Sequence, residues 1–171
     1  KGKYILALGR IVPEKGFDTL IDAFVRANLD GYKLVIAGRA DHEDAYSAAL
    51  EKQAKESGVV LTGFIKGEKL NQIMTNARLF VLPSYHEGLP ISLLEAMSYG
   101  IDVVVSDIPA NKLQVLEADD FFHAGDIPGL AEKLRSKLSN PGNGPREYDL
   151  TLYNWDTIAR QTLAVYEKAR H

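Results

Sequence analysis

Short runs of apolar and β-branched residues alternate with longer segments of helical periodicity along nearly the whole chain. The apolar runs occupy residues 4–8, 33–38, 59–65, 78–83, 102–107 and 121–124. Several of them, such as "YILAL" and "DVVVSD", have continuously apolar centres, as expected of strands that are covered on both faces. Strands that alternate with helices favour a parallel sheet with helices on both sides. We therefore predict an α/β fold: a doubly wound, Rossmann-like parallel sheet of about six strands.

The segments between these runs have the spacing of helices. Phe17, Leu20, Ile21 and Phe24 recur at i, i+3, i+4 and i+7, which places them on one face of a helix. Further helices are predicted over residues 44–57, 68–77, 90–99 and 128–138, and a last amphipathic helix over residues 155–166. A chain of 171 residues can bury one sizeable core, so we expect one Rossmann-like domain over residues 1–171.

Composition excludes several classes of protein. Lys and Arg number 20 against 23 Asp and Glu, so the chain has no basic excess for binding nucleic acid. It contains no cysteine, which rules out disulfide frameworks and thiolate metal sites. No apolar run is long enough to span a membrane, and no signal peptide is visible. Because the chain lacks an initiating Met and starts at once with a strand, we expect it to be a piece of a longer protein.

The loop after the first predicted strand carries two cations. In parallel sheets of this type, ligands bind at the carboxyl ends of the strands. The segment "GRIVPEKGF" places Arg10 and Lys15 in such a loop, directly before a helix. Arg can bind a phosphate through two hydrogen bonds and Lys as a point charge, so the pair suits a phosphate group. The alternative is a solvated loop that turns at Pro13, Glu14 and Gly16.

The loop after the fourth predicted strand, within "HEGLPISLLEAMSYG", combines acids with an anion-binding geometry. Gly88 allows close approach of a ligand, and we expect free amides at Ile91 and Ser92 in the first turn of the helix that Pro90 starts. An acid beside an anion site repels the anion unless it binds something else. Glu87 in the loop and Glu95 on the helix therefore suit hydroxyl groups of one extended ligand. The alternative is that the helix dipole favours Glu87 and that Glu95 is a surface residue.

The chain resembles the carboxyl-terminal, donor-binding domain of group 1 (family 4) glycosyltransferases. The resemblance rests on "GRIVPEKGFDTLIDAF", "LVIAG", "LTGFI", "EGLPISLLEAMSYG", "VVVSDIPAN" and "NWDTIARQTLAVYEK", and covers essentially the whole chain. An acid, seven residues and a second acid, followed by Ala-Met-x-x-Gly after a buried strand, form its most specific part. These are retaining enzymes of the two-domain GT-B architecture, and they use nucleotide-diphosphate sugars as donors.

The resemblance implies a role for each candidate residue. Arg10 and Lys15 match the basic pair on the donor diphosphate. Glu87 matches the acid that faces the transferred sugar, which makes it the catalytic candidate. The backbone around it would contact sugar and phosphate at Gly88, Leu89 and Ile91.

The remaining donor contacts are implied in the same way. Glu95 matches the second acid, which holds the ribose, and the "GFI" step around Ile65 matches the segment that reads the nucleobase. The resemblance also implies that no metal or other cofactor is needed. It implies a cytoplasmic location, with the full-length protein peripheral on the inner face of the membrane.

Some positions depart from the family pattern or remain open. Asp102 stands where the family usually has proline, which we expect to alter only the turn into the fifth strand. Gln114 stands near a further family Glu. Residues 41–44 and 117–120 contain acids that could bind a divalent metal, but helix caps and solvated turns account for them better. His86 could contact the donor, and His123 is expected in the core or at an edge of the short sixth strand.

The predicted function is donor binding for retaining transfer of a sugar to an acceptor hydroxyl, in polysaccharide, lipopolysaccharide or glycolipid synthesis. The sugar or glycolipid acceptor, and any membrane contact, would use an amino-terminal domain that this chain lacks. The isolated chain should therefore bind nucleotide and transfer nothing. Two alternatives remain open: a non-catalytic nucleotide-sugar-binding module, and a nucleotide-sugar epimerase or hydrolase on the same architecture.

Overall fold

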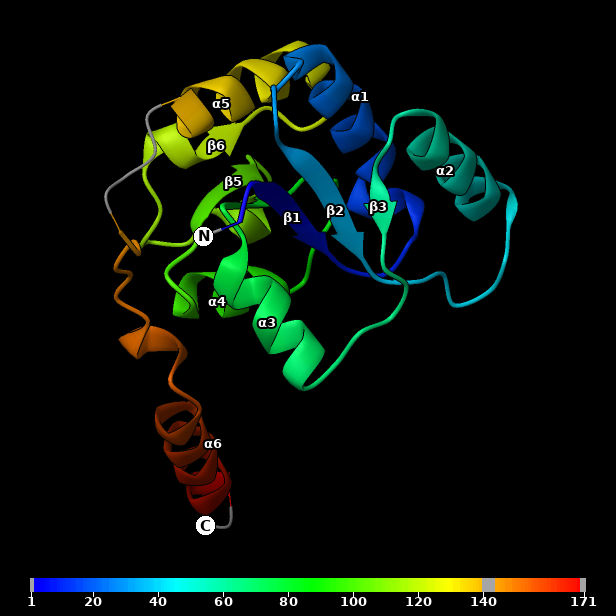
Figure 1. The fold of residues 1–171 in the computed structure, drawn as a ribbon. Coiled ribbons are helices and arrows are strands. Elements are labelled where there is room, and N and C mark those ends of the chain that lie inside the picture. Colours follow the sequence, from blue (N-terminus) through cyan, green and yellow to red (C-terminus); the bar gives the residue numbers. More distant parts are fainter. Residues whose placement is uncertain (1, 140–143, 170–171) are drawn as a thin grey trace.

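The computed structural model describes residues 2–139 and 144–169. Six parallel strands form one sheet in the order β3-β2-β1-β4-β5-β6 (Figure 1). The strands are β1 (Tyr4–Leu8), β2 (Lys33–Ala37), β3 (Val60–Leu61), β4 (Leu79–Leu82), β5 (Asp102–Ser106) and β6 (Phe121–Phe122). The helices are α1 (Phe17–Ala27), α2 (Ala45–Glu56), α3 (Glu68–Asn76), α4 (Ile91–Ser98), α5 (Ile127–Ser139) and α6 (Trp155–Ala169). The predicted doubly wound parallel sheet is thus confirmed.

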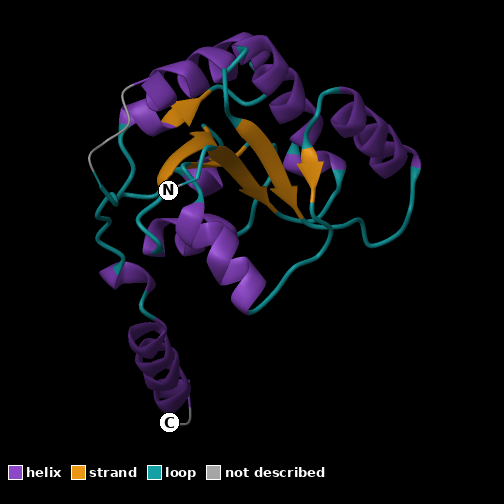
Figure 2. Cartoon of the chain, viewed as in Figure 1, coloured by secondary structure: helices purple, strands orange, loops and turns teal. Residues whose placement is uncertain are grey.

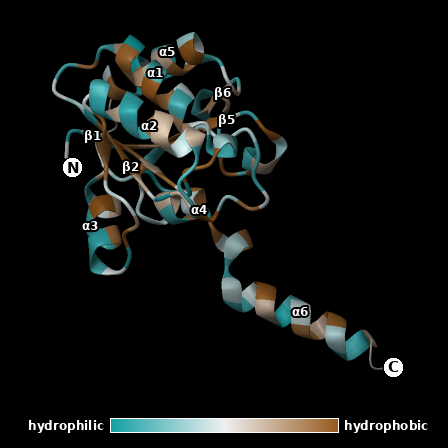
Figure 3. Cartoon of the chain, turned by 90° about the vertical axis from the view of Figure 1, so that its right-hand side faces the viewer, coloured by the Kyte–Doolittle hydropathy of each residue, from teal (hydrophilic) through white to brown (hydrophobic). Residues whose placement is uncertain are grey.

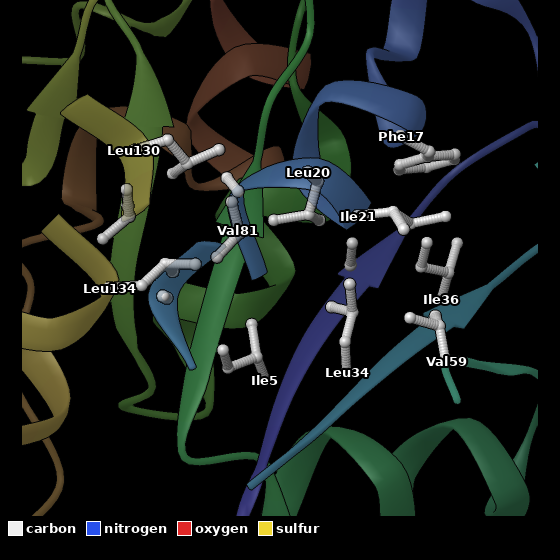
Figure 4. Packing of buried hydrophobic residues seen from close by; sticks show 14 of the residues in the cluster. Ile5, Phe17, Leu20, Ile21, Leu34, Ile36, Val59, Val81, Leu130 and Leu134 are labelled. Carbon is white, nitrogen blue, oxygen red and sulfur yellow. The ribbon is translucent and has the colours of Figure 1, made fainter. Parts of the chain in front are cut away.

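Helices cover both faces of the sheet, as the continuous apolar strands require (Figure 2). Successive side chains of a strand point to opposite faces, so each strand contributes to two cores. Ile5 and Val81 pack with α1, α2 and α5 on one face (Figure 4). Leu6 and Phe80 pack with α3 and α4 on the other. Burial on both faces fixes the register of these strands and therefore the positions of the loops that follow them.

The two edge strands are shorter than the sequence predicts. Within the expected strand over residues 59–65, the parallel pairing covers only Val60–Leu61. Gly63 adopts a positive φ of 69°, which turns the chain and leaves a single antiparallel bridge to Gly38. The expected strand over residues 121–124 pairs only at Phe121–Phe122. A turn closed by Asp126 N–H and the His123 carbonyl then ends it.

The last helix, α6, extends away from the body of the sheet (Figures 1 and 3). It is amphipathic, as its pattern predicts, but none of its described residues is buried. Trp155 and Tyr166 are 66% and 67% exposed. None of the helices among the described residues is both long and apolar enough to cross a membrane.

Candidate functional site

Strands β1 and β4 lie side by side at the point where the strand order reverses. The chain leaves β1 toward β2 on one side and later returns to place β4 on the other. The loops that follow these two strands therefore diverge, and the crevice between them is where ligands bind in open sheets of this kind. These are the two loops that carry the predicted cations and the first predicted acid.

Gly16 allows the β1 loop to approach the β4 loop closely. The loop forms a short 3-10 helix, Pro13–Lys15, which ends at Gly16 with a left-handed φ of 62°. A Cβ at Gly16 would lie 2.5 Å from the Pro83 carbonyl oxygen, so only glycine fits here without a shift. The Tyr85 N–H donates to the Glu14 carbonyl at 2.8 Å, which joins the two loops.

Lys15 and Glu87 meet across this contact. The Lys15 Nζ lies 2.6 Å from Glu87 Oε1, and the two side chains are 19% and 8% exposed. Ser84 Oγ donates to the same oxygen at 2.7 Å. Positions 72 residues apart in sequence thus form one partly buried ion pair. Coulomb attraction is stronger in such surroundings than in bulk water, so this pair is held more firmly than one on the surface.

Arg10 occupies a different place from Lys15. Its Nη1 lies 2.8 Å from Asp41 Oδ2, and the two side chains are 65% and 57% exposed. The alternative of a solvated loop therefore describes the surroundings of Arg10 but not those of Lys15. Because exposed ion pairs are worth at most about 1 kcal/mol, the Arg10 guanidinium can exchange Asp41 for another anion at little cost.

The start of α4 has free amides, though with one difference from the prediction. Pro90 is the N-cap of α4 and not its first residue. The Ile91 N–H donates to the Leu89 carbonyl at 2.9 Å, so the expectation of a free Ile91 amide was wrong. The amides of Gly88, Leu89 and Ser92 form no hydrogen bond within the described residues. They lie at the positive end of the helix dipole and can donate hydrogen bonds to an anion.

A pocket of about 410 Å³ lies at the carboxyl ends of β1 and β2. It contains Arg10 and the predicted Ile65, and its other lining residues are Leu8, Gly9, Ala37, Gly38, Arg39, Asp41, Phe64 and Leu70. The Arg39 guanidinium lies 5.5 Å from the centre of the Phe64 ring at the pocket wall. A planar, partly apolar group is the kind of ligand that such a wall can accommodate.

Glu95 lies apart from this pocket. It is exposed on α4 and lines a second hollow of about 250 Å³ with Ile91, Leu94, Ser98, Leu150, Tyr153 and Trp155. The two hollows share no lining residue. A ligand that contacts both Ile65 and Glu95 must therefore extend out of the first pocket.

Comparison with known proteins identifies the family. The family model for glycosyl transferases group 1 matches residues 1–151. The chain belongs to the group 1 glycosyl transferases.

Relatives and solved structures agree with this assignment. The chain is 30% identical to an uncharacterized glycosyltransferase of Methanocaldococcus jannaschii, over 98% of this chain and 45% of that protein. It is 32% identical to phosphatidyl-myo-inositol mannosyltransferase of Mycobacterium leprae, over 97% and 46%. Sucrose-phosphate synthase from Thermosynechococcus elongatus has a similar structure, with a TM-score of 0.84 at 26% identity, over 99% and 46%. The chain therefore spans a little under half the length of each of these proteins, and it has the Rossmann-like fold of GT-B glycosyltransferases.

The structure of this group 1 domain also contains site residues that the sequence did not single out. Ser84, which holds Glu87, lies in a loop where serine is common and carries no motif of its own. Tyr85 shares a 2.7 Å hydrogen bond with Thr19 of α1. Together with the Tyr85 N–H bond to Glu14, this contact fixes the two loops relative to each other. Only the three-dimensional contact identifies these residues.

His86 and His123 have different surroundings. The exposed His86 side chain forms no hydrogen bond with the described residues. His123 lies just beyond β6, where its Nδ1 is 3.0 Å from Asp107 Oδ2. This hydrogen bond raises the pKa of His123 and lowers the pKa of Asp107, which also accepts from the Ala124 N–H. The expectation that His123 lies on the sixth strand, in the core or at its edge, was wrong because that strand ends at Phe122.

The acidic segments serve as caps and in an ion-pair cluster. Asp44 caps α2 through the Ser47 N–H, as expected. Asp120 is fully buried and bound by Lys137 and Arg146, so the expectation of a solvated turn was wrong there. Asp102 also bonds both cations and does more than alter a turn. Within residues 2–139 and 144–169, no three His, Cys, Asp or Glu side chains are grouped as a metal site requires.

Proposed function

We propose that this chain is the donor-binding domain of a retaining glycosyltransferase that uses a nucleotide-diphosphate sugar. The observation that supports the proposal best is the Lys15–Glu87 pair at the strand-order reversal, beside the free amides at the start of α4. An isolated acid here would repel a diphosphate. Because Lys15 neutralises Glu87, an anion and an acid that accepts a hydroxyl can occupy neighbouring positions.

Each part of the donor has a candidate partner. The diphosphate would contact Arg10, Lys15 and the amides of Gly88 and Leu89. The transferred sugar would donate a hydroxyl hydrogen bond to Glu87. The nucleobase suits the pocket lined by Ile65, Phe64 and Arg39, and the ribose hydroxyls suit Glu95 on α4.

In the proposed reaction the bond between the anomeric carbon and the diphosphate oxygen breaks, and the acceptor hydroxyl oxygen forms the new bond on the same face. Negative charge develops on the departing diphosphate, and a diphosphate oxygen takes up the proton that the acceptor hydroxyl loses. Arg10, Lys15 and the free amides would stabilise that charge where it develops, as an oxyanion hole does. The acceptor and the rest of the catalytic groups would come from a domain outside this chain, so the chain alone is expected to bind donor without transfer. The whole protein would then contribute to polysaccharide or glycolipid synthesis.

The first experiment screens this chain by thermal shift against UDP, GDP and ADP and their sugars. Stabilisation by one base class identifies the donor for calorimetry. Arg10→Ala and Lys15→Ala should then weaken the nucleoside diphosphate about 10- to 100-fold and leave the nucleoside nearly unchanged, because each removes a charge-assisted contact. Lys15→Ala should have the larger effect, since it also leaves Glu87 unpaired beside the diphosphate. Equal losses for nucleoside and nucleoside diphosphate would refute the phosphate assignment.

The two acids can be separated by ligand. Glu95→Gln should weaken the nucleoside diphosphate but not its 2′,3′-dideoxy analogue, because only the former offers ribose hydroxyls. Glu87→Gln should leave nucleoside diphosphate affinity unchanged or higher and weaken the nucleotide sugar. If both variants lose the same affinity for the dideoxy ligand, the acids act through the fold and not through the donor.

A further inference from the structure

The Glu87 carboxylate is held by only one of its two oxygens. Oε1 accepts from Lys15 Nζ at 2.6 Å and from Ser84 Oγ at 2.7 Å. Oε2 forms no hydrogen bond with any described residue. The carboxylate is therefore fixed by Oε1 and leaves Oε2 for another donor, and its orientation depends on where Ser84 holds it.

Ser84 is in turn held by β5. Its carbonyl oxygen accepts from Ser106 Oγ at 2.5 Å, and both serines are fully buried. Ser106 ends β5, the neighbour of β4 in the sheet, and Leu82 pairs with Val105 just before the two serines. This hydrogen bond continues the contact between the strands past the end of their pairing and fixes the loop that leads to Glu87.

Asn111 completes this chain of hydrogen bonds. It lies at the end of a 3-10 helix, Pro109–Asn111, and is fully buried. Its Nδ2 lies 3.1 Å from the Ser106 carbonyl and 3.0 Å from Ser106 Oγ. The amide cannot be flipped, because Oδ1 would then face the Ser106 carbonyl, acceptor against acceptor.

The donor and acceptor of each hydrogen bond follow from the groups involved. Asn111 Nδ2 can only donate, so Ser106 Oγ accepts from it and uses its own hydrogen for the Ser84 carbonyl, which can only accept. The Ser84 hydroxyl hydrogen is then directed to Glu87. A carboxylate that accepts from both Ser84 and Lys15 through Oε1 is held in one orientation.

Asn111 is also a poor means of stabilising a core. Its Oδ1 is the one buried side-chain polar atom without a partner found among the described residues. Burying an unpartnered acceptor lowers the stability of the folded state, so a leucine of similar shape would suit the core better. The contribution of Asn111 therefore lies in what its Nδ2 holds.

We propose that Asn111, Ser106 and Ser84 are positioning residues that hold Glu87 so that Oε2 faces the donor sugar. The proposal rests on the function proposed above for Glu87. None of the three needs to touch the donor: Asn111 and Ser106 act through Ser84, and Ser84 acts through the anchored oxygen of Glu87.

The test is a double-mutant cycle on sugar recognition in the full-length protein. Calorimetry measures the ratio of affinities for nucleotide sugar and nucleoside diphosphate, with UDP-glucose and UDP or GDP-mannose and GDP as the screen selects. Asn111→Leu should lower this ratio about tenfold in the wild type and leave it unchanged in a Glu87→Gln background. Nucleoside diphosphate affinity should not fall. The melting temperature is recorded separately, because the substitution removes the unpartnered Asn111 Oδ1 but also takes a donor from Ser106. Ser106→Ala should change the affinity ratio in the same way and replaces Asn111→Leu if that variant does not fold. Its melting temperature should be lower than that of the wild type, because the Ser84 carbonyl loses its donor.

Ser47→Ala is the matched control. Ser47 is likewise a buried hydroxyl, but it caps α2 away from the site, so its loss should affect stability and not the ratio. An unchanged ratio in both Asn111→Leu and Ser106→Ala would overturn the positioning role while the donor function stands. A loss that persists in the Glu87→Gln background would overturn it too. If Glu87→Gln itself leaves the ratio unchanged, the sugar-facing role of Glu87 fails, and the positioning role fails with it.

Discussion

Asp120→Asn is expected to destabilise the domain by about 3 kcal/mol, although Asp120 is outside the ligand site. Its side chain is 1% exposed, and its two oxygens accept from Lys137 Nζ, from both terminal nitrogens of Arg146 and from the Glu117 N–H. Each oxygen has two of these donors. Asparagine replaces one oxygen with an NH₂ group, so two donors face a donor whichever way the amide is turned.

The magnitude follows from what remains after the substitution. Removing one partner of a buried ion pair costs about 3–5 kcal/mol, because it leaves an uncompensated buried charge. Asp102 Oδ1 still lies 3.2 Å from Lys137 and 3.0 Å from Arg146, which places the effect at the low end of that range. For a domain of this size, about 3 kcal/mol corresponds to a fall in melting temperature of roughly 6–12 °C.

The pH dependence gives a second test. Burial alone would raise the pKa of Asp120, but the hydrogen bonds from Arg146, the Glu117 amide and Lys137 outweigh it and lower the pKa. The ionised group therefore contributes its full stabilisation above the unfolded pKa of about 3.9, and the contribution is lost as the pH falls through the lower folded pKa. The stability difference between wild type and Asp120→Asn should be constant near neutral pH and narrow as the pH falls below about 4.

Urea denaturation of this chain, followed by circular dichroism, measures both effects. Asp119→Asn is the matched control, since it removes the same formal charge one residue earlier. The Asp119 side chain is 62% exposed and pairs with Lys133 at 2.8 Å and more distantly with Lys137 at 3.5 Å. Because this carboxylate is exposed and Lys137 keeps Asp102 and Asp120, its loss should cost at most about 1 kcal/mol. Equal losses in the two variants, or a difference that does not narrow in acid, would refute the assignment of a buried ionic cluster.

Two further predictions concern the β1 loop. Asp41→Asn should raise nucleoside diphosphate affinity by up to about fivefold in calorimetry, because it releases an Arg10 guanidinium held by an exposed pair; a loss of affinity would show that Asp41 helps to bind the ligand. Gly16→Ala should lower the free energy of unfolding in urea by more than Gly58→Ala. Both glycines have a left-handed φ, which costs alanine about 1–2 kcal/mol, but only at Gly16 does the added Cβ meet the Pro83 carbonyl. Equal losses of stability in the two variants would exclude the close approach as the cause.

The fold could be predicted from the sequence because each strand is buried on both faces. A continuous apolar run such as Val103–Val104–Val105 suits a strand covered by helices on both sides, and the alternation with helices leaves only a parallel sheet. The edge strands were predicted less well. The residues with strand propensity extend beyond the residues that pair with a neighbouring strand. At β3, the positive φ of Gly63 ends the parallel pairing with β2.

The sequence predicted which residues belong to the site better than it predicted which of them contact one another. Lys15 and Glu87 could be chosen from the sequence, since each follows a strand whose carboxyl end meets the same edge of the sheet. Their direct pairing depends on a close approach of two loops, set by Gly16 and the Tyr85 amide, that no local pattern reports. Asp102 and Asp120 were misjudged for the same reason: their cationic partners come from α5 and the segment that follows it.

The two cations of the β1 loop differ in which existing contact a bound diphosphate would have to displace. Lys15 is partly buried against Glu87 and held in place before any ligand arrives, whereas Arg10 is exposed and paired with a single surface acid. A diphosphate that contacts Lys15 adds a third charge to an existing pair, so the ammonium need not move. One that contacts Arg10 must replace Asp41, and the long guanidinium side chain must then be ordered at an entropic cost. We therefore expect Lys15 to set the position of the diphosphate and Arg10 to close onto it afterwards. Arg10→Lys should therefore retain less nucleoside diphosphate affinity than its unchanged charge suggests, because an ammonium point charge cannot replace the bidentate contact of a guanidinium.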